Sequence, residues 1–128
     1  MDDDQTHVTR RRTNIMKKLS KKQNKHLRKL SAVAYEKELS FYLDDLRSKF
    51  DEWKNGEIDV WELSDIIHKF HDGKSRDLYK FYVYRDDYSL HVAHAVKNNY
   101  VALNEIDESC REHVQVLLDN YLIDTDEE

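Results

Sequence analysis

Seven histidines are the first candidates for chemistry in this chain of 128 residues. Four of them form two pairs with the spacing His-x-x-His, His68 with His71 and His91 with His94. Three-residue spacing places both imidazoles of a pair on one face of a helix. Two such faces could together offer four nitrogens to zinc or another transition metal. We favour the interpretation that His94 and one histidine of the first pair line the edge of the core while the others are solvated, so no cofactor is expected and the metal site is the alternative.

The segment from Arg85 to His91 is a second candidate, because an arginine and a histidine flank a short polar spacer that includes Asp86. It resembles the arginine, polar residue, spacer and histidine motif of HEPN ribonucleases, which are small all-α domains. The resemblance implies that Arg85 and His91 of two protomers meet at a dimer interface and cleave RNA without a metal. The alternative is an exposed arginine and a half-buried histidine without a catalytic role.

Residues 51–62, DEWKNGEIDVWE, resemble an EF-hand calcium loop, in which several oxygens surround the ion and a glycine turns the chain. Six residues match the loop, but Trp53 stands where an oxygen ligand is expected. The alternative is a helical corner at Gly56, followed by a capping box between Asp59 and Glu62 that starts the next helix. Trp53 also continues the apolar stripe before the corner, so we favour the corner. The six matching residues are Asp51, Asn55, Gly56, Ile58, Asp59 and Glu62.

Four tyrosines lie within ten residues, which is more aromatic surface than one small core is expected to bury. Exposed tyrosine and arginine side chains are typical anchors of protein interfaces. This pattern favours a small non-catalytic binding or accessory protein that contacts another protein. An antitoxin-like or immunity-like subunit would have this layout by analogy. The candidate partner-binding residues are Tyr79, Tyr82, Tyr84 and Tyr88.

The charges are unevenly distributed along the chain. Residues 1–30 hold ten Lys/Arg against three Asp, whereas the remainder holds eleven Lys/Arg against twenty-three Asp/Glu. An acidic body suits a basic partner. The basic arm could contact nucleic-acid phosphates without reading sequence, because it has no interleaved aromatic residues; the alternative is a solvated charged helix. The candidate contacts are Arg10, Arg11, Arg12, Lys17, Lys18, Lys21 and Lys22.

Apolar residues at steps of three and four predict the helices that position these groups. Asn55-Gly56 separates two such stripes, so we expect a corner there. Gly73 is predicted to end the second helix and Ser75 to cap a third. We expect residues 46–84 to form the core of the protein. The stripes consist of Leu39, Leu43, Leu46, Phe50 and Trp53 before the corner, and Val60, Leu63, Ile67 and Phe70 after it.

The whole pattern predicts an all-α fold, a compact bundle of five to six helices with a basic N-terminal arm. The arm covers residues 1–30 and is partly disordered or helical. A single helical domain covers 31–123, and an acidic tail covers 124–128. The helices are expected at 31–54, 59–71, 75–85, 89–98 and 106–122, with Asn98-Asn99 ending the fourth. Residues 35–85 also resemble small helical bacterial proteins of unassigned function, which implies no particular activity.

Several classes of protein are not expected. No run of 18 apolar residues suggests a membrane span, and the N-terminus lacks the apolar stretch of a secretory signal. The single cysteine, Cys110, rules out an internal disulfide and a cysteine zinc cluster, and its apolar neighbours predict a buried thiol. No glycine-rich phosphate loop is present. We therefore expect a cytoplasmic protein.

Overall fold

The computed structural model describes the backbone of residues 19–127 and the side chains of residues 19–120. This part of the chain is all-α, as predicted, with four helices and one 3-10 turn, and without a strand. Helix α2 spans Lys21–Lys54. A second long helix consists of α3 (Val60–Phe70), the π turn η1 (His71–Ser75), α4 (Arg76–Tyr79) and the π turn η2 (Lys80–Tyr84). Then follow α5 (Tyr88–Lys97), the 3-10 turn η3 (Leu103–Glu105) and α6 (Glu108–Glu127).

Helix α2 begins earlier than expected because Ser20 and Gln23 form a capping box. The Gln23 amide donates to Ser20 Oγ at 3.0 Å, and the Ser20 amide donates to Gln23 Oε1 at 2.7 Å. These bonds satisfy amides that have no partner within the first turn of a helix. The boundary predicted at residue 30 therefore falls inside a helix, and Leu27 is completely buried.

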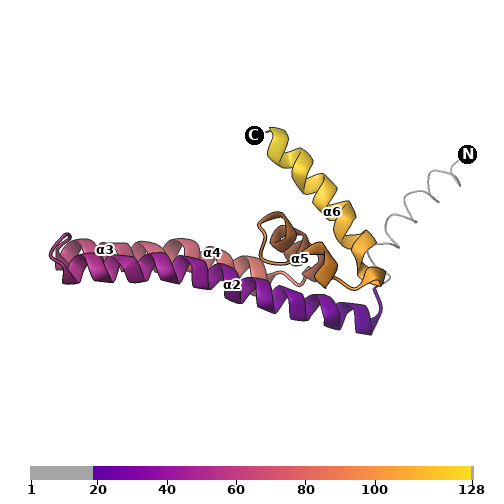
Figure 1. The fold of residues 1–128 in the computed structure, drawn as a ribbon, viewed down its shortest axis with the longest axis horizontal. Coiled ribbons are helices and arrows are strands. Elements are labelled where there is room, and N and C mark those ends of the chain that lie inside the picture. The colour runs from indigo at the N-terminus through magenta and orange to yellow at the C-terminus, as the bar shows by residue number, and fades with distance from the viewer. Residues whose placement is uncertain (1–18, 128) are drawn as a thin grey trace, which may run out of the picture.

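The corner after α2 forms as predicted. Asn55 ends the helix, and Gly56 adopts a φ of 78°. Asp59 Oδ1 accepts from the Glu62 amide at 2.7 Å, and Glu62 Oε1 accepts from the Asp59 amide at 3.2 Å. The capping box starts α3, which runs back along α2 (Figure 1).

The prediction of a break between residues 71 and 75 is wrong. Gly73 lies inside a continuous helix, and Ser75 has helical dihedral angles without a capping bond from its side chain. A glycine inside a helix costs only about 1 kcal/mol, which packing of the flanking apolar residues against α2 can offset. The predicted five to six helices are therefore four.

We predicted the core in residues 46–84, but most of it lies where α5 and α6 pack near the N-terminal half of α2, and we call this part the base of the molecule. Between residues 39 and 70 only Leu63 is buried. Two antiparallel helices can bury only the sides that face each other, and α5 and α6 cover α2 only near its N-terminal half (Figure 1). The core cluster consists of Leu27, Ala34, Leu78, Tyr82, Val92, Ala93, Ala95, Val101, Ile106, Cys110 and Val114.

The short helix α5 at the base is capped at both ends. The Leu90 amide donates to Asp87 Oδ1 at 3.2 Å where α5 begins, and Asn99 ends α5 with a φ of 66°, as expected of an asparagine there.

Cys110 is completely buried, as predicted, and burial raises the pKa of its thiol. Within residues 19–127, no helix is both long enough and apolar enough to cross a bilayer.

Candidate functional site

The strongest candidate for a functional surface is the helical hairpin formed by residues 39–70, which projects away from the core (Figure 1). Its two helices meet through residues that follow the a and d positions of a heptad repeat. On α2 these are Leu39, Tyr42, Leu46, Lys49 and Trp53, and on α3 they are Leu63, Ile66 and Phe70; Leu63 is buried and the others are half-buried.

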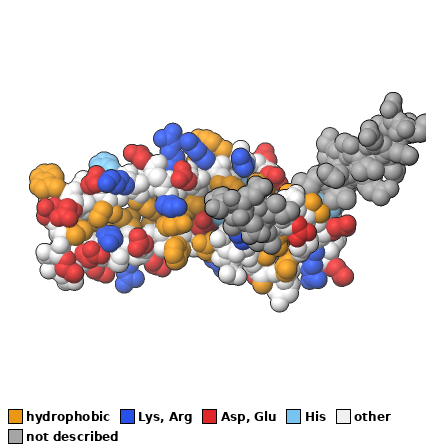
Figure 2. Space-filling view, turned by 90° about the horizontal axis from the view of Figure 1, so that it is seen from above, with side chains coloured by type: hydrophobic (Ala, Val, Ile, Leu, Met, Phe, Trp, Pro, Cys, Tyr) orange, Lys and Arg blue, Asp and Glu red, His pale blue; other side chains and the backbone are white. Residues whose placement is uncertain are grey.

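One face of this hairpin is apolar and open to solvent. Leu43 and Phe50 of α2, and Val60 and Ile67 of α3, occupy position e of the same repeat, and all four are exposed. In an antiparallel pair the e positions of both helices emerge on the same side, so the four residues share one side of the hairpin, and we name this apolar surface between the two helices the apolar groove. Hydrophobic side chains run in a row along the hairpin in Figure 2.

The opposite face of the hairpin is acidic. Position g holds Asp45, Glu52 and Glu62, with Lys69 as the one cation. Glu38, which lies beside α5, also holds position g, so the apolar groove faces away from α5 and is not covered by the protein's own core. The apolar stripes predicted from the sequence include all four groove residues. Their assignment to position e required the structure, which shows which residues lie between the two helices.

The four tyrosines predicted to bind a partner have different environments. Tyr79 and Tyr84 are exposed and contact each other edge to face, with ring centroids 5.2 Å apart. Tyr88 is half-buried against His91. Tyr82 belongs to the core, stacks on Tyr35 at 4.8 Å and is only 6% exposed. The prediction that Tyr82 is an exposed anchor is therefore wrong, because its position faces α2.

A hollow of about 370 Å³ lies beside Tyr79 and Tyr84, and we name it the tyrosine hollow. Its walls come from both π turns, from α4 and from α2. Burial, together with the nearby Tyr79, raises the pKa of the Tyr35 hydroxyl, so two phenol groups lie close together in it. The lining residues are Tyr35, His71, Asp72, Ser75, Arg76, Tyr79 and Tyr84.

Arg85 and His91 do not form an exposed catalytic pair. Arg85 is exposed in the extended link before α5, whereas His91 is 0% exposed. His91 Nδ1 forms a hydrogen bond of 2.8 Å with Ser31 Oγ, and its ring packs on Phe81 and Tyr82. A histidine enclosed in this way cannot reach an RNA backbone, so the ribonuclease prediction is not supported by the geometry.

The two histidine pairs do not converge either. His68 and His71 are exposed on the second long helix, His91 is buried, and His94 is part of the core edge. No group of three or more histidine, cysteine or acidic side chains suited to a metal ion occurs among the described residues. The four-histidine site, which was the alternative interpretation of the spacing, is therefore not formed by these residues.

A buried polar network joins α2, η2 and α5 instead. Glu38 Oε1 accepts a hydrogen bond of 2.7 Å from the Tyr82 hydroxyl and lies 3.0 Å from His94 Nε2. Burial alone would raise the pKa of the Glu38 carboxyl, but the hydrogen bonds from His94 and Tyr82 outweigh it, and the pKa lies below its ordinary value. The sequence interpretation missed Glu38 and Ser31, although both follow the line of Leu27 and Ala34 in steps of three and four.

The EF-hand resemblance does not lead to a calcium loop. Residues 51–54 are the last turn of α2, and residues 60–62 are the first turn of α3, so only the five residues between them form a turn. Asp59 and Glu62 use their side-chain oxygens to cap α3 rather than to converge on an ion. The alternative of a helical corner is therefore the correct one.

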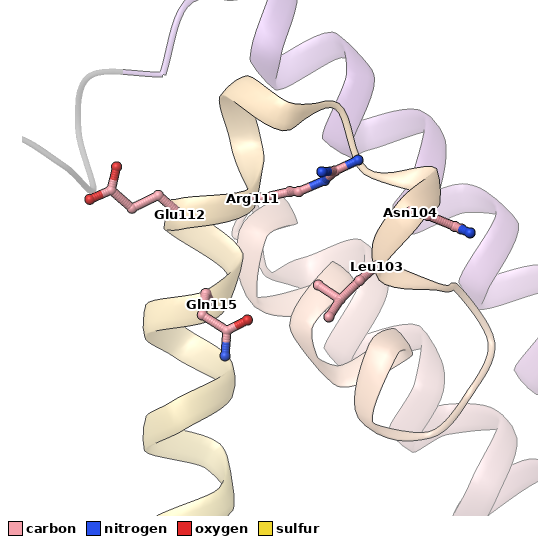
Figure 3. A pocket seen from close by; sticks show the side chains of 5 residues that line it. All are labelled: Leu103, Asn104, Arg111, Glu112 and Gln115. Atoms are coloured by element: carbon pink, nitrogen blue, oxygen red, sulfur yellow. The ribbon is translucent and has the colours of Figure 1, made fainter.

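Two other hollows lie at the base of the molecule. One, of about 450 Å³, is lined by Leu103, Asn104, Arg111, Glu112 and Gln115. Arg111 Nε donates to the Ile106 carbonyl at 2.9 Å, and Arg111 and Glu112 point in different directions (Figure 3). The other, of about 520 Å³, separates the starts of α2 and α6 and includes Lys22, His26 and Asp107. Neither gathers side chains into a recognisable reactive centre.

The predicted nucleic-acid arm lies mostly outside the described residues, which is the case for Arg10, Arg11, Arg12, Lys17 and Lys18. Lys21 and Lys22 lie in the first turn of α2 and are exposed. The same face of α2 continues with the exposed residues Lys25, Arg28 and Lys29. None of these five cations lies within 4.0 Å of a described carboxylate. The pKa of the Asp107 carboxyl is lowered mainly by its hydrogen bond with Ser109, and the charge of Lys22 contributes to the same lowering.

No protein-family model, no curated protein and no solved structure matches the chain. The function is therefore inferred from the geometry of the described residues.

Proposed function

We propose that this chain is a small non-catalytic protein-binding module, and that its projecting hairpin binds an amphipathic helix of a partner protein. The observation that carries the proposal is the apolar groove of Leu43, Phe50, Val60 and Ile67, which the protein's own core leaves uncovered. A peptide helix laid in such a groove is a common mode of recognition, in which apolar residues at i, i+3, i+4 and i+7 provide the contacts.

The heptad pattern supports a missing third element. Two helices that pair only with each other need apolar residues at positions a and d. Helices that face a larger core have an additional apolar residue at e or g. Here the e positions are apolar on both helices, so the hairpin has the sequence of a bundle that lacks at least one helix. Trp61, 78% exposed near the turn, adds apolar surface at the tip.

The charges beside the groove suggest the chemistry of the partner. Arg47 and Lys54 come four residues after the groove residues Leu43 and Phe50, and therefore lie beside the groove on α2. Neither cation lies within 4.0 Å of a described carboxylate. The acidic residues that favoured a basic partner lie on the opposite face of the hairpin, at Asp45, Glu52 and Glu62. The helix that fills the groove should therefore have an apolar face with acidic residues along one edge.

Synthetic helical peptides can test this proposal. One peptide has an apolar stripe flanked by glutamate, and a second has the same stripe flanked by lysine. We expect the glutamate peptide to bind more tightly, measured by fluorescence anisotropy of a labelled peptide. The double variant Leu43→Ser/Ile67→Ser should weaken its binding at least about tenfold, which corresponds to about 1.4 kcal/mol. The control Phe41→Ser, which removes an exposed ring at position c, should leave binding unchanged.

Three outcomes would contradict the proposal. Equal binding by the groove variant and the control would show that the groove is not the contact surface. Tighter binding of the lysine peptide would show that the partner chemistry is wrong. A concentration-dependent dimer in sedimentation that the groove variant abolishes would show that a second copy of this chain, rather than another protein, covers the groove.

A second candidate function is contact with nucleic acid, and the exposed cations at the start of α2 favour it. Four exposed cations lie on one side of the helix, at spacings of three, four, seven and eight residues. They are Lys21, Lys25, Arg28 and Lys29. The opposite side, with Leu27 and Ser31, is buried against the core and holds the cations in place. A rigid row of unpaired cations suits phosphate contacts that do not depend on sequence.

A further inference from the structure

The tyrosine hollow lies where the apolar groove ends near the base of the hairpin. Along the second long helix, the groove residues Val60 and Ile67 are followed at steps of four by His71, Ser75 and Tyr79. Residues four apart lie on the same side of a helix, so the groove leads toward the hollow. His71, Ser75 and Tyr79 are among the residues that line it.

The hollow also coincides with the only irregular part of this helix. Both π turns, η1 and η2, contribute to its wall, and π turns within α-helices are frequent at functional positions. Tyr35 of α2 is one of its lining residues and stacks on Tyr82, whose hydroxyl donates a hydrogen bond to Glu38. The core therefore fixes one wall of the hollow, while Tyr79 and Tyr84 remain exposed.

The charges of the lining select among possible occupants. Asp72 and Arg76 contribute one charge of each sign, and neither lies within 4.0 Å of an oppositely charged described group. A cationic occupant would be attracted by Asp72 but repelled by Arg76, and the reverse holds for an anionic occupant, so the lining favours neither sign of charge. An uncharged aromatic occupant avoids both repulsions and can contact three tyrosine rings, which favour offset or edge-to-face packing.

We propose that the tyrosine hollow is a binding site for an uncharged aromatic side chain, which anchors one end of the partner helix. This inference rests on the proposed function, since the groove delivers the helix to the hollow. A volume of about 370 Å³ is within the range of small-molecule pockets and accommodates an indole ring. Aromatic anchors in pockets commonly dominate the binding energy of an interface.

A single-residue probe tests the hollow independently of the groove. N-acetyl-tryptophanamide should produce saturable NMR shifts of the Ser75 and Tyr79 backbone amides in the full chain. N-acetyl-argininamide and phenyl phosphate, which carry the two opposite charges, should produce smaller shifts. The variant Tyr79→Ala/Tyr84→Ala should abolish the tryptophanamide shifts of Ser75, while the control Phe41→Ala, also an exposed ring of the hairpin, should retain them. Thermal melts check that the variants are folded. We expect them to fold, because the three replaced rings are exposed.

The glutamate-flanked peptide then tests the anchor in place. One peptide has a tryptophan at its N-terminal end and another has it at its C-terminal end. We expect only one of the two to bind more tightly than the parent, by about tenfold, and to lose this gain in Tyr79→Ala/Tyr84→Ala.

The inference is overturned if tryptophanamide causes no shifts at the hollow, if either charged probe causes larger ones, or if the parent peptide binds and neither tryptophan peptide binds more tightly than it. Binding of the parent peptide without these gains would leave the proposed function intact and reject the hollow alone. Shifts by tryptophanamide without any peptide binding would reject the groove and retain the hollow as an aromatic site.

Discussion

His91 illustrates how one buried side chain links pH to stability. Burial lowers the pKa of its imidazole, and the backbone of Phe81 and the Asp87 carboxylate oppose this only in part. His94 and Arg85 lower the pKa of His91 further. The hydrogen-bond partner of its ring is the neutral Ser31 hydroxyl rather than a carboxylate. The folded state therefore holds His91 neutral at a pH at which the unfolded chain already binds the proton.

The sign of the resulting pH dependence follows from this shift. A pKa below the ordinary value of 6.5 means that the stabilisation is present above about pH 6.5 and is lost as the pH falls toward the folded-state pKa. We expect the free energy of unfolding, measured in urea, to decline through this window. The variant His91→Phe should flatten the decline, whereas His68→Phe, at an exposed histidine, should not. Equal slopes in both variants would show that His91 is not the group responsible.

Glu38 is the residue on which the buried network depends. Its carboxylate accepts from the Tyr82 hydroxyl and lies within hydrogen-bond distance of His94. We expect Glu38→Ala to lower the free energy of unfolding by about 2–3 kcal/mol, because buried polar groups lose a charged partner. Glu38→Gln keeps a carbonyl acceptor of the same shape and should cost less. Urea unfolding decides the order, and equal losses in the two variants would contradict a role for the hydrogen bonds.

At the scale of elements, the two glycines have opposite roles although the sequence suggested that both end helices. Gly56 has a φ of 78°, a conformation that side chains with a Cβ rarely adopt, while Gly73 lies within the continuous helix 60–84. Neither glycine has an atom within 4 Å of an added Cβ, so packing does not decide the effect of a methyl group.

These positions make a matched pair of substitutions. Gly56→Ala should lower the free energy of unfolding by about 1 kcal/mol, because of strain in the left-handed conformation. Gly73→Ala should raise it by about 0.5–1 kcal/mol, because alanine loses less backbone entropy in a helix. Thermal melts of the two variants should move in opposite directions. A fall in both midpoints would show that the helix is interrupted at Gly73.

At the scale of the whole molecule, charge and apolar surface are arranged around a small core. The core holds the base of α2 against α5 and α6, while no described element covers the apolar side of the projecting hairpin (Figure 1). The row of cations at the start of α2 lies at the other end of the same helix. The two candidate binding surfaces therefore occupy different parts of α2, residues 21–29 and residues 43–50, and can be tested independently.

The nucleic-acid candidate predicts a salt-dependent affinity for duplex DNA. Binding by the full chain should weaken steeply between about 50 and 200 mM salt, since phosphate contacts release counterions. The variant Lys21→Glu/Lys25→Glu should reduce both the affinity and the salt slope. The control Lys54→Glu changes an exposed cation of the hairpin and should have little effect. Binding that does not respond to salt, or that all variants retain, would reject the contact.

Sequence alone determined the features that depend on residues within four or five positions of one another. The corner at Gly56, the capping box of Asp59 and Glu62, and the end of α5 at Asn99 were predictable, because their hydrogen bonds and dihedral angles are local. The prediction failed at Gly73 because a local preference of about 1 kcal/mol yields to packing along the whole helix.

Only the tertiary structure decided where the core and the open surfaces lie. The apolar stripes of the hairpin and of the base have the same period, so spacing alone could not show that α5 and α6 cover one and leave the other exposed. His91 and Glu38 are polar residue types that sequence reasoning assigns to catalysis, metal binding or the surface. Their burial follows from contacts with residues 44 to 60 positions away. Contacts of this kind depend on how the helices pack together, whereas local hydrogen bonds depend only on the residues of one turn.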